Sequence, residues 1–306
     1  MDICQELGYL DSLAQCVESH TCDCEIVVPT IINCIHSSSS MEGAPMFKMP
    51  TNNLSAKSLL ILSQLGVFAV FAYWAVEEGS GDNMDYVFLT MMAGAGLALF
   101  LSVPNARMGV SLGIPALMVV IGLAMGEDEM MFWAVFMLIM IGPIAYMPAM
   151  AIGDPTLGLD DESRLQRLGI LWIVFALFMM FMMSGLGSLA MDGELTESEE
   201  EGEEFTIILD STEQTIAQGG LAVGIIGVLV FLLTAVMGSE VGPLRPWHGG
   251  AMASVALLIS QYLWMTAEGS PGDQMGDLFM IICFVGILTL TPCIAYEGSS
   301  DSSESE

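Results

Sequence analysis

Cysteine and histidine side chains gather near the amino terminus, where they could bind a metal ion. His20, Cys22 and Cys24 occupy alternate positions, and Cys34 and His36 follow with the same alternation. Thiolate sulfur and imidazole nitrogen are ligands that zinc prefers in proteins. A reducing cytoplasm keeps thiols from pairing and favours metal binding over a disulfide. The sequence therefore nominates these five residues as zinc ligands.

Two other states fit the same cysteines. The alternating spacing is not the wider ligand spacing of a zinc finger, so unligated thiols are the alternative to a metal site. Disulfides from Cys4 to Cys34 and from Cys16 to Cys22 or Cys24 would require an oxidising compartment.

A second set of polar residues lies inside long apolar segments. Gln64, Ser254 and Gln261 could contact a neutral solute, or they could form hydrogen bonds to neighbouring helices. The interiors of these segments carry no ionisable side chain, which argues against a proton relay or an ion pathway. The chain has no nucleophile elbow, H-E-x-x-H sequence or phosphate-binding loop, so we expect no enzymatic activity.

The elements that position these residues follow from composition. The chain has 306 residues, of which 54% are hydrophobic and 14% are charged. A soluble domain carries about 25% charged residues, so the composition indicates a membrane protein in contact with the lipid bilayer. Its 36 acidic and 6 basic residues give a formal net charge of −30, which argues against binding to nucleic acid.

Eight apolar segments each approach the roughly 20 residues that a helix needs to cross a bilayer. They lie near residues 58–76, 87–103, 108–125, 130–151, 168–191, 219–238, 249–267 and 277–296. We predict a cytoplasmic cysteine-bearing segment and linker at 1–52, a transmembrane domain at 53–298 and an acidic cytoplasmic tail at 299–306. The predicted fold class is all-α, a polytopic transmembrane helical bundle of four hairpins.

The few basic residues predict an orientation in the membrane. With eight spans, all of them fall on one side: Lys48, Lys57, Arg107, Arg164, Arg167 and Arg245. Loops on the cytoplasmic side of membrane proteins are enriched in Lys and Arg. We therefore expect a multi-pass protein of the cell membrane with both termini in the cytoplasm.

An internal repeat supports the hairpin architecture. Residues 73–88 (YWAVEEGSGDNMDYVF) resemble residues 262–279 (YLWMTAEGSPGDQMGDLF), and each copy is an acidic, glycine-rich turn between apolar runs. In the predicted topology both turns face outward, so the two hairpins would form a parallel repeat.

Two functions fit these features. Parallel repeats and proline-interrupted helices recur in transporters, which favours a carrier or permease for a small neutral or cationic solute. Uncharged spans favour the alternative, a non-catalytic membrane scaffold or assembly subunit. Small-xxx-small pairs at Gly109 and Gly113 and at Gly220 and Gly224 could join helices within the bundle or in a homo- or hetero-oligomer.

Overall fold

The computed structural model describes residues 55–77, 83–126, 128–198, 204–239, 241–269 and 275–297. This part of the chain is mostly helical. Its longer helices are α3 (Ala56–Glu77), α4 (Asn83–Phe100), α6 (Ile114–Met125), α7 (Asp128–Ile152), α8 (Asp161–Phe178), α10 (Ser211–Phe231), α11 (Pro246–Thr266) and α12 (Met275–Glu297). Shorter segments are α5 (Ala106–Met108), the 3₁₀ turn η2 (Pro155–Leu157), α9 (Leu186–Met191) and the π-helical η1 (Gly109–Gly113), η3 (Met179–Met183) and η4 (Leu232–Val236).

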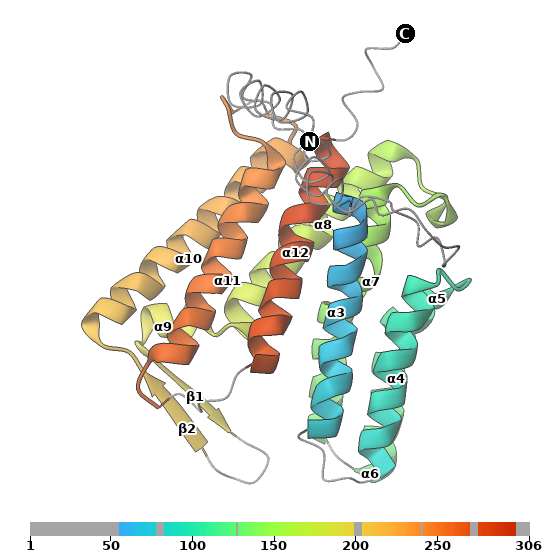
Figure 1. Cartoon of the computed structure of the whole chain (residues 1–306), viewed down its shortest axis with the longest axis horizontal. Coiled ribbons are helices and arrows are strands. Elements are labelled where there is room, and N and C mark those ends of the chain that lie inside the picture. Colours follow the sequence, from blue (N-terminus) through green and yellow to red (C-terminus); the bar gives the residue numbers. More distant parts are fainter. Residues whose placement is uncertain are drawn as a thin grey trace, which may run out of the picture.

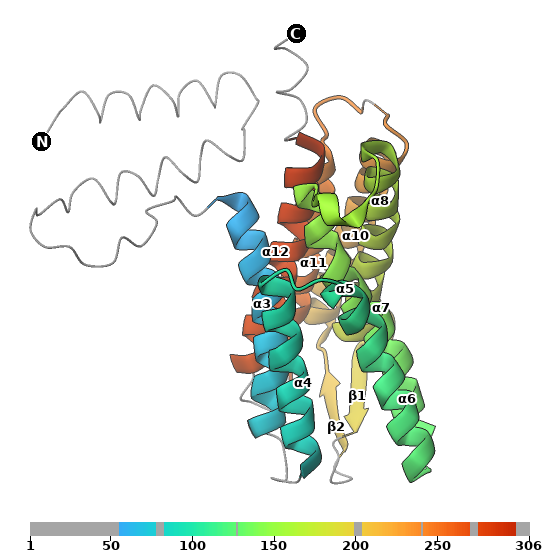
Figure 2. The same cartoon turned by 90° about the vertical axis from the view of Figure 1, so that its right-hand side faces the viewer.

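The helices form two layers. Helices α10, α11, α12, α3 and α4 stand side by side in that order, each packed on the next (Figure 1). Helices α6, α7 and α8 form the second layer, and the side view separates α6 and α7 from α3 and α4 (Figure 2). Helix α7 contacts α3, α6, α8 and α12, so α7 and α12 form the centre of the bundle.

Six helical stretches in the described part of the chain are long and apolar enough to cross a membrane: Ala56–Val76, Ala106–Ala124, Met131–Ile152, Asp161–Met183, Ser211–Val236 and Leu278–Tyr296. These stretches indicate an integral membrane protein. The apolar part of α4, Tyr86–Phe100, is shorter, about 22 Å at 1.5 Å per residue. Helix α11 occupies the position of another predicted span, but it includes several polar side chains and is not among the six.

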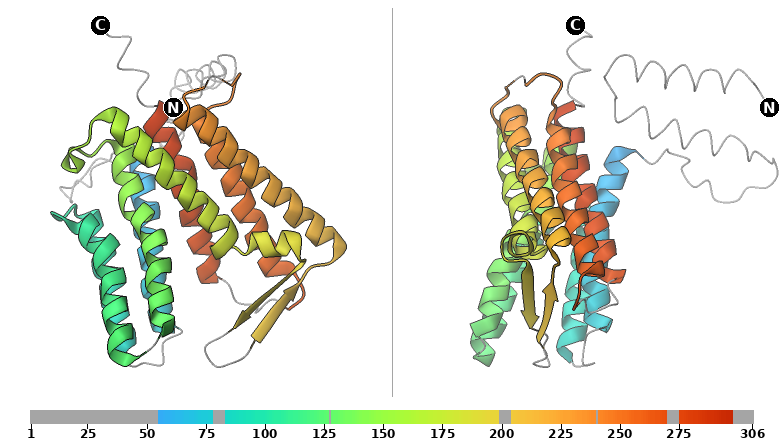
Figure 3. Two further views of the ribbon diagram at one scale, coloured as in Figure 1. Left: turned by 180° about the vertical axis from the view of Figure 1, so that it is seen from behind. Right: turned by 90° about the vertical axis from the view of Figure 1, so that its left-hand side faces the viewer.

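The predicted span 168–191 is interrupted in the structure. The helix that begins as α8 ends with η3 at Met183, and Gly185 then adopts a left-handed φ of 59°. Helix α9 follows in a new direction and is seen end-on when the long helices stand upright (Figure 3, right). Glycine has no Cβ and tolerates this backbone conformation, which lets the chain turn between the two helices.

A two-stranded antiparallel sheet lies between the predicted spans 168–191 and 219–238. Strands β1 (Glu194–Ser198) and β2 (Glu204–Ile208) pair with Thr196 opposite Thr206. The backbone N–H of Ile208 donates to the carbonyl of Glu268, 3.0 Å away, and so ties β2 to the end of α11. Gly269 follows with a φ of 85°, and a Cβ there would overlap the Thr206 carbonyl.

Glycines also bring α10 and α11 together. A Cβ on Gly227 of α10 would lie 2.8 Å from the carbonyl oxygen of Gly249 on α11, and a Cβ on Gly249 would lie 2.6 Å from the carbonyl of Gly227. Gly220 and Gly224 make similarly close approaches to Ile259 and Ala256 of α11. The predicted pair at 220 and 224 therefore packs helices within this chain.

The described basic residues share one end of the bundle, which we call the cationic end. Helices α3, α8 and α11 begin there, whereas the β1–β2 hairpin marks the opposite end (Figure 1). Lys57 lies in the first turn of α3, Arg107 in α5, Arg164 and Arg167 near the start of α8, and Arg245 just before α11.

Candidate functional site

Both central helices contain prolines. Pro143 and Pro148 lie inside α7, and Pro292 lies inside α12. Proline has no backbone N–H, so the carbonyl four residues earlier loses its helical donor. Pro148 releases the carbonyl of Ile144 in this way, and Pro292 releases that of Leu288. In a membrane interior such groups must be satisfied by the protein or by ordered water.

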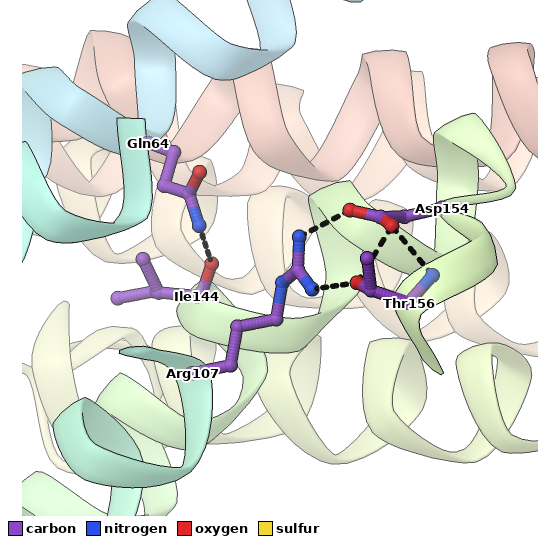
Figure 4. A network of polar contacts seen from close by, with 5 residues as sticks. All are labelled: Gln64, Arg107, Ile144, Asp154 and Thr156. Atoms are coloured by element: carbon purple, nitrogen blue, oxygen red, sulfur yellow. Dashed lines mark hydrogen bonds and ion pairs between the residues drawn. The ribbon is translucent and has the colours of Figure 1, made fainter. Parts of the chain in front are cut away.

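Gln64 satisfies the carbonyl that Pro148 releases. The side-chain amide of Gln64, on α3, donates to the Ile144 carbonyl oxygen at 2.7 Å (Figure 4). Gln64 is only 7% exposed, so this bond is shielded from water. The residue that the sequence nominated for solute contact thus holds α3 against α7.

Trp172 plays the same part for α12. Its indole N–H donates to the carbonyl oxygen of Leu288 at 2.9 Å, and the whole side chain is buried. The indole also stacks on Phe231 of α10, with ring centroids 4.0 Å apart. Trp172 thereby links α8, α10 and α12 at the proline of α12.

The other two nominated residues lie on α11. The hydroxyl of Ser254 shares a hydrogen bond with that of Thr289 on α12, with the oxygens 2.9 Å apart. Gln261 is buried on the same helix, at 7% exposure, and also has an interaction partner. Gln64 thus lies on α3, whereas Ser254 and Gln261 lie on α11. The hydrogen bonds of Gln64 and Ser254 each join two helices.

The helix break at Ser184 is held by further polar contacts, which sequence analysis missed. The carbonyl of Ser184 accepts from the hydroxyl of Ser260 at 2.6 Å and from the indole N–H of Trp264 at 3.0 Å. Both donors lie on α11, one turn apart. The only sequence signal was the presence of two glycines, Gly185 and Gly187, within an apolar segment. Closely spaced glycines are typical of a break in a helix.

A polar clasp joins two loops at the cationic end. The guanidinium of Arg107 forms an ion pair with Asp154 and also donates to the hydroxyl of Thr156 at 2.9 Å (Figure 4). Partial burial raises the pKa of Asp154, but hydrogen bonds from Thr156 and the nearby guanidinium lower it more, so the net pKa lies below its usual value. The clasp ties α5 to the connection between α7 and α8.

A neighbouring set of bonds holds the ends of both central helices to α8. Arg164 donates to the carbonyl of Met150 near the end of α7 and pairs with Asp161 at 3.0 Å. The hydroxyl of Tyr296, near the end of α12, donates to the carbonyl of Leu165 at 2.9 Å. The segments that follow Pro148 and Pro292 are therefore both anchored to the first turns of α8.

The nominated zinc ligands belong to the amino-terminal segment. His20, Cys22, Cys24, Cys34 and His36 lie outside the described residues, so zinc binding stays a prediction. Within the ranges that the structure describes, His, Cys, Asp and Glu form no cluster of three or more that could hold a metal ion.

Comparison with protein families, curated proteins and solved structures finds no match to this chain.

Proposed function

We propose that this chain is a non-catalytic membrane scaffold or assembly subunit. One observation carries the proposal. Gln64 and Ser254, which a solute could have used, form hydrogen bonds that fix α3 to α7 and α11 to α12. Polar side chains used in this way stabilise a bundle, because a membrane offers helices no hydrophobic reason to associate.

The assembly role is supported by glycines that have no neighbour within the described chain. Gly94 on α4 and Gly109 and Gly113 in η1 have no atom within 4 Å of the place where a Cβ would lie. Their surfaces could admit a helix of a second copy or of another protein. We propose that α4 and η1 present the assembly face, in contrast to Gly220 and Gly224, which pack inside the chain.

The proposed topology has eight spans and cytoplasmic termini in the cell membrane. It is supported by the position of the described cations at one end and by the matching hairpins. The carboxyl end of α11 and the amino ends of α4 and α12 all lie at the opposite end (Figure 1). Hairpins α3–α4 and α11–α12 pack through α3 and α12, which is compatible with a parallel repeat.

A second candidate is a carrier for a small neutral or cationic solute. It is favoured by the prolines within the two central helices, because a proline leaves a backbone carbonyl without its helical donor, and free backbone carbonyls form part of the binding sites of transporters. In this case the bonds from Gln64 and Trp172 would break and re-form during transport.

Flux through proteoliposomes separates the two functions. Purified full-length protein would be reconstituted and tested with glycerol and urea by osmotic swelling, and with potassium and choline by tracer uptake. The scaffold proposal predicts the flux of protein-free liposomes for every solute. Saturable flux that Gln64→Leu alters would establish the carrier instead.

Assembly and orientation are tested separately. Size-exclusion chromatography with light scattering should show an oligomer that Gly109→Ile with Gly113→Ile dissociates. In intact cells, a membrane-impermeant maleimide should label Glu268→Cys but not Lys57→Cys, with the unaltered chain as background. A monomeric wild type argues against self-assembly, and labelling of Lys57→Cys would reverse the orientation.

A further inference from the structure

Helix α4 ends before it reaches the cationic end of the bundle. Its last residue and the following α5 lie farther from that end than the beginning of α3 and the end of α12 do (Figure 1, Figure 2). The apolar part of α4, Tyr86–Phe100, is about 22 Å long, whereas the apolar stretch Ala56–Val76 of the neighbouring α3 is about 31 Å long at 1.5 Å per residue. The hydrocarbon core of a bilayer is about 30 Å thick, so α3 matches it and α4 is too short.

The connection from α4 to α5 stops the helix by its own sequence. Pro104 cannot continue a helix, and Ser102 and Asn105 adopt left-handed φ angles of 52° and 60°. Short polar side chains tolerate this conformation better than most residues do. Every residue from 101 to 105 is exposed. The end of α4 is therefore an irregular, exposed turn of the backbone.

This connection has the composition of a boundary between lipid and water. Ser102 and Asn105 are polar, whereas Leu101 and Val103 are apolar and are 68% and 46% exposed. Irregular backbone does not occur where it faces hydrocarbon, because lipid tails cannot form hydrogen bonds with it. Either lipid headgroups and water reach the connection, or another protein segment covers it.

The polar clasp favours headgroups and water over an apolar cover. Arg107 follows the connection in α5, and its ion pair with Asp154 is partly exposed, with side chains at 20% and 14%. A charged pair that faces hydrocarbon is costly. Headgroup oxygens and water can form hydrogen bonds with the guanidinium and with the side chains of Ser102 and Asn105, whereas an apolar segment cannot.

We propose that the bilayer thins beside α4, so that phospholipid headgroups and water reach the connection between α4 and α5. A bilayer commonly accommodates a short transmembrane segment by thinning around it. Helix α4 is the outermost helix of the first layer, so lipid has direct access to it. The inference does not depend on whether the chain transports a solute or assembles with a partner.

Access of water to position 103 tests the proposal. Val103→Cys and Leu62→Cys would each be made in the full-length chain and reconstituted in nanodiscs of dioleoyl phosphatidylcholine. A membrane-impermeant maleimide would be added after reduction, and peptide mass spectrometry would locate the label, so that the native cysteines do not interfere. Leu62 is the matched control, because it is 47% exposed and lies about 9 Å along α3 from the first residue of that helix.

The reactive form of cysteine is the thiolate, which requires water, so Val103→Cys should react at least about tenfold faster than Leu62→Cys. Leu101→Cys, at a side chain that is 68% exposed, provides a second measurement on the same connection. Protection of both connection cysteines would overturn the proposal and would show that protein covers the turn. Equal rates at positions 103 and 62 would also overturn it, because the membrane boundary would then lie at this depth on α3 as well.

Discussion

Replacement of Gln64 by leucine tests whether its amide compensates for Pro148. Leucine is apolar and similar in size to glutamine, so the variant removes the amide donor that lies 2.7 Å from the Ile144 carbonyl oxygen and leaves most of the side-chain volume in place. A hydrogen bond between membrane helices contributes about 0.6 kcal/mol on average and about 1.7 kcal/mol at most. Because Pro148 has already removed the helical donor, the carbonyl would be left unpaired, and we expect a loss of about 1–2 kcal/mol.

Pro148→Ala makes the prediction specific. Alanine restores a backbone N–H at position 148, which can donate to the Ile144 carbonyl as in an uninterrupted helix. In that background Gln64→Leu should cost less than about 0.5 kcal/mol, which gives a coupling of about 1 kcal/mol in a double-mutant cycle. Pro143→Ala is the matched control: that proline releases a different carbonyl, so the cost of Gln64→Leu should be unchanged.

The assay is equilibrium unfolding in mixed micelles, in which a denaturing detergent is titrated into a mild one and tryptophan fluorescence is followed. All four proteins of the cycle, and the two of the Pro143 control, are compared under the same conditions. Equal costs of Gln64→Leu in the wild-type and Pro148→Ala backgrounds would show that the amide does not act through the released carbonyl.

Three further predictions concern packing, backbone conformation and charge. Gly227→Ala should destabilise the bundle by about 1–3 kcal/mol because its Cβ would meet the backbone of α11, whereas Gly219→Ala on the open side of α10 should be neutral or stabilising in the same unfolding assay. Gly269→Ala should loosen the β hairpin and speed its hydrogen exchange more than Gly242→Ala does, since both have positive φ but only position 269 faces a carbonyl. The lowered pKa of Asp154 means that its stabilising effect is present above its unfolded pKa of about 4 and is lost as pH falls through the lower folded value. Asp154→Asn should therefore have a lower Tm than wild type at pH 7, and the difference should shrink below about pH 4; a constant difference would contradict the ion pair.

Helix positions were predictable because they depend on local properties of the chain. Long runs without charge bury their backbone polar groups only as helices in a membrane, so apolar length alone located helices such as α3, α7 and α12. The number of spans is less local, since the short apolar part of α4 depends on neighbours and on bilayer thickness. The β hairpin was missed because its strands are only five residues long and flank an acidic run in the sequence, and the bond that ties β2 to the segment after α11 joins residues far apart in the chain.

The sequence also determined which carbonyls would lack a helical donor, because each proline marks the residue four positions before it. Only the tertiary structure decided the donors: Gln64 lies 80 residues from Ile144, and Trp172 lies 116 residues from Leu288. No local pattern relates such distant residues, since they meet only when α3 packs on α7 and α8 packs on α12. The same packing left the hydroxyl of Thr291 buried beside the proline of α12, a feature that its sequence neighbours alone do not reveal.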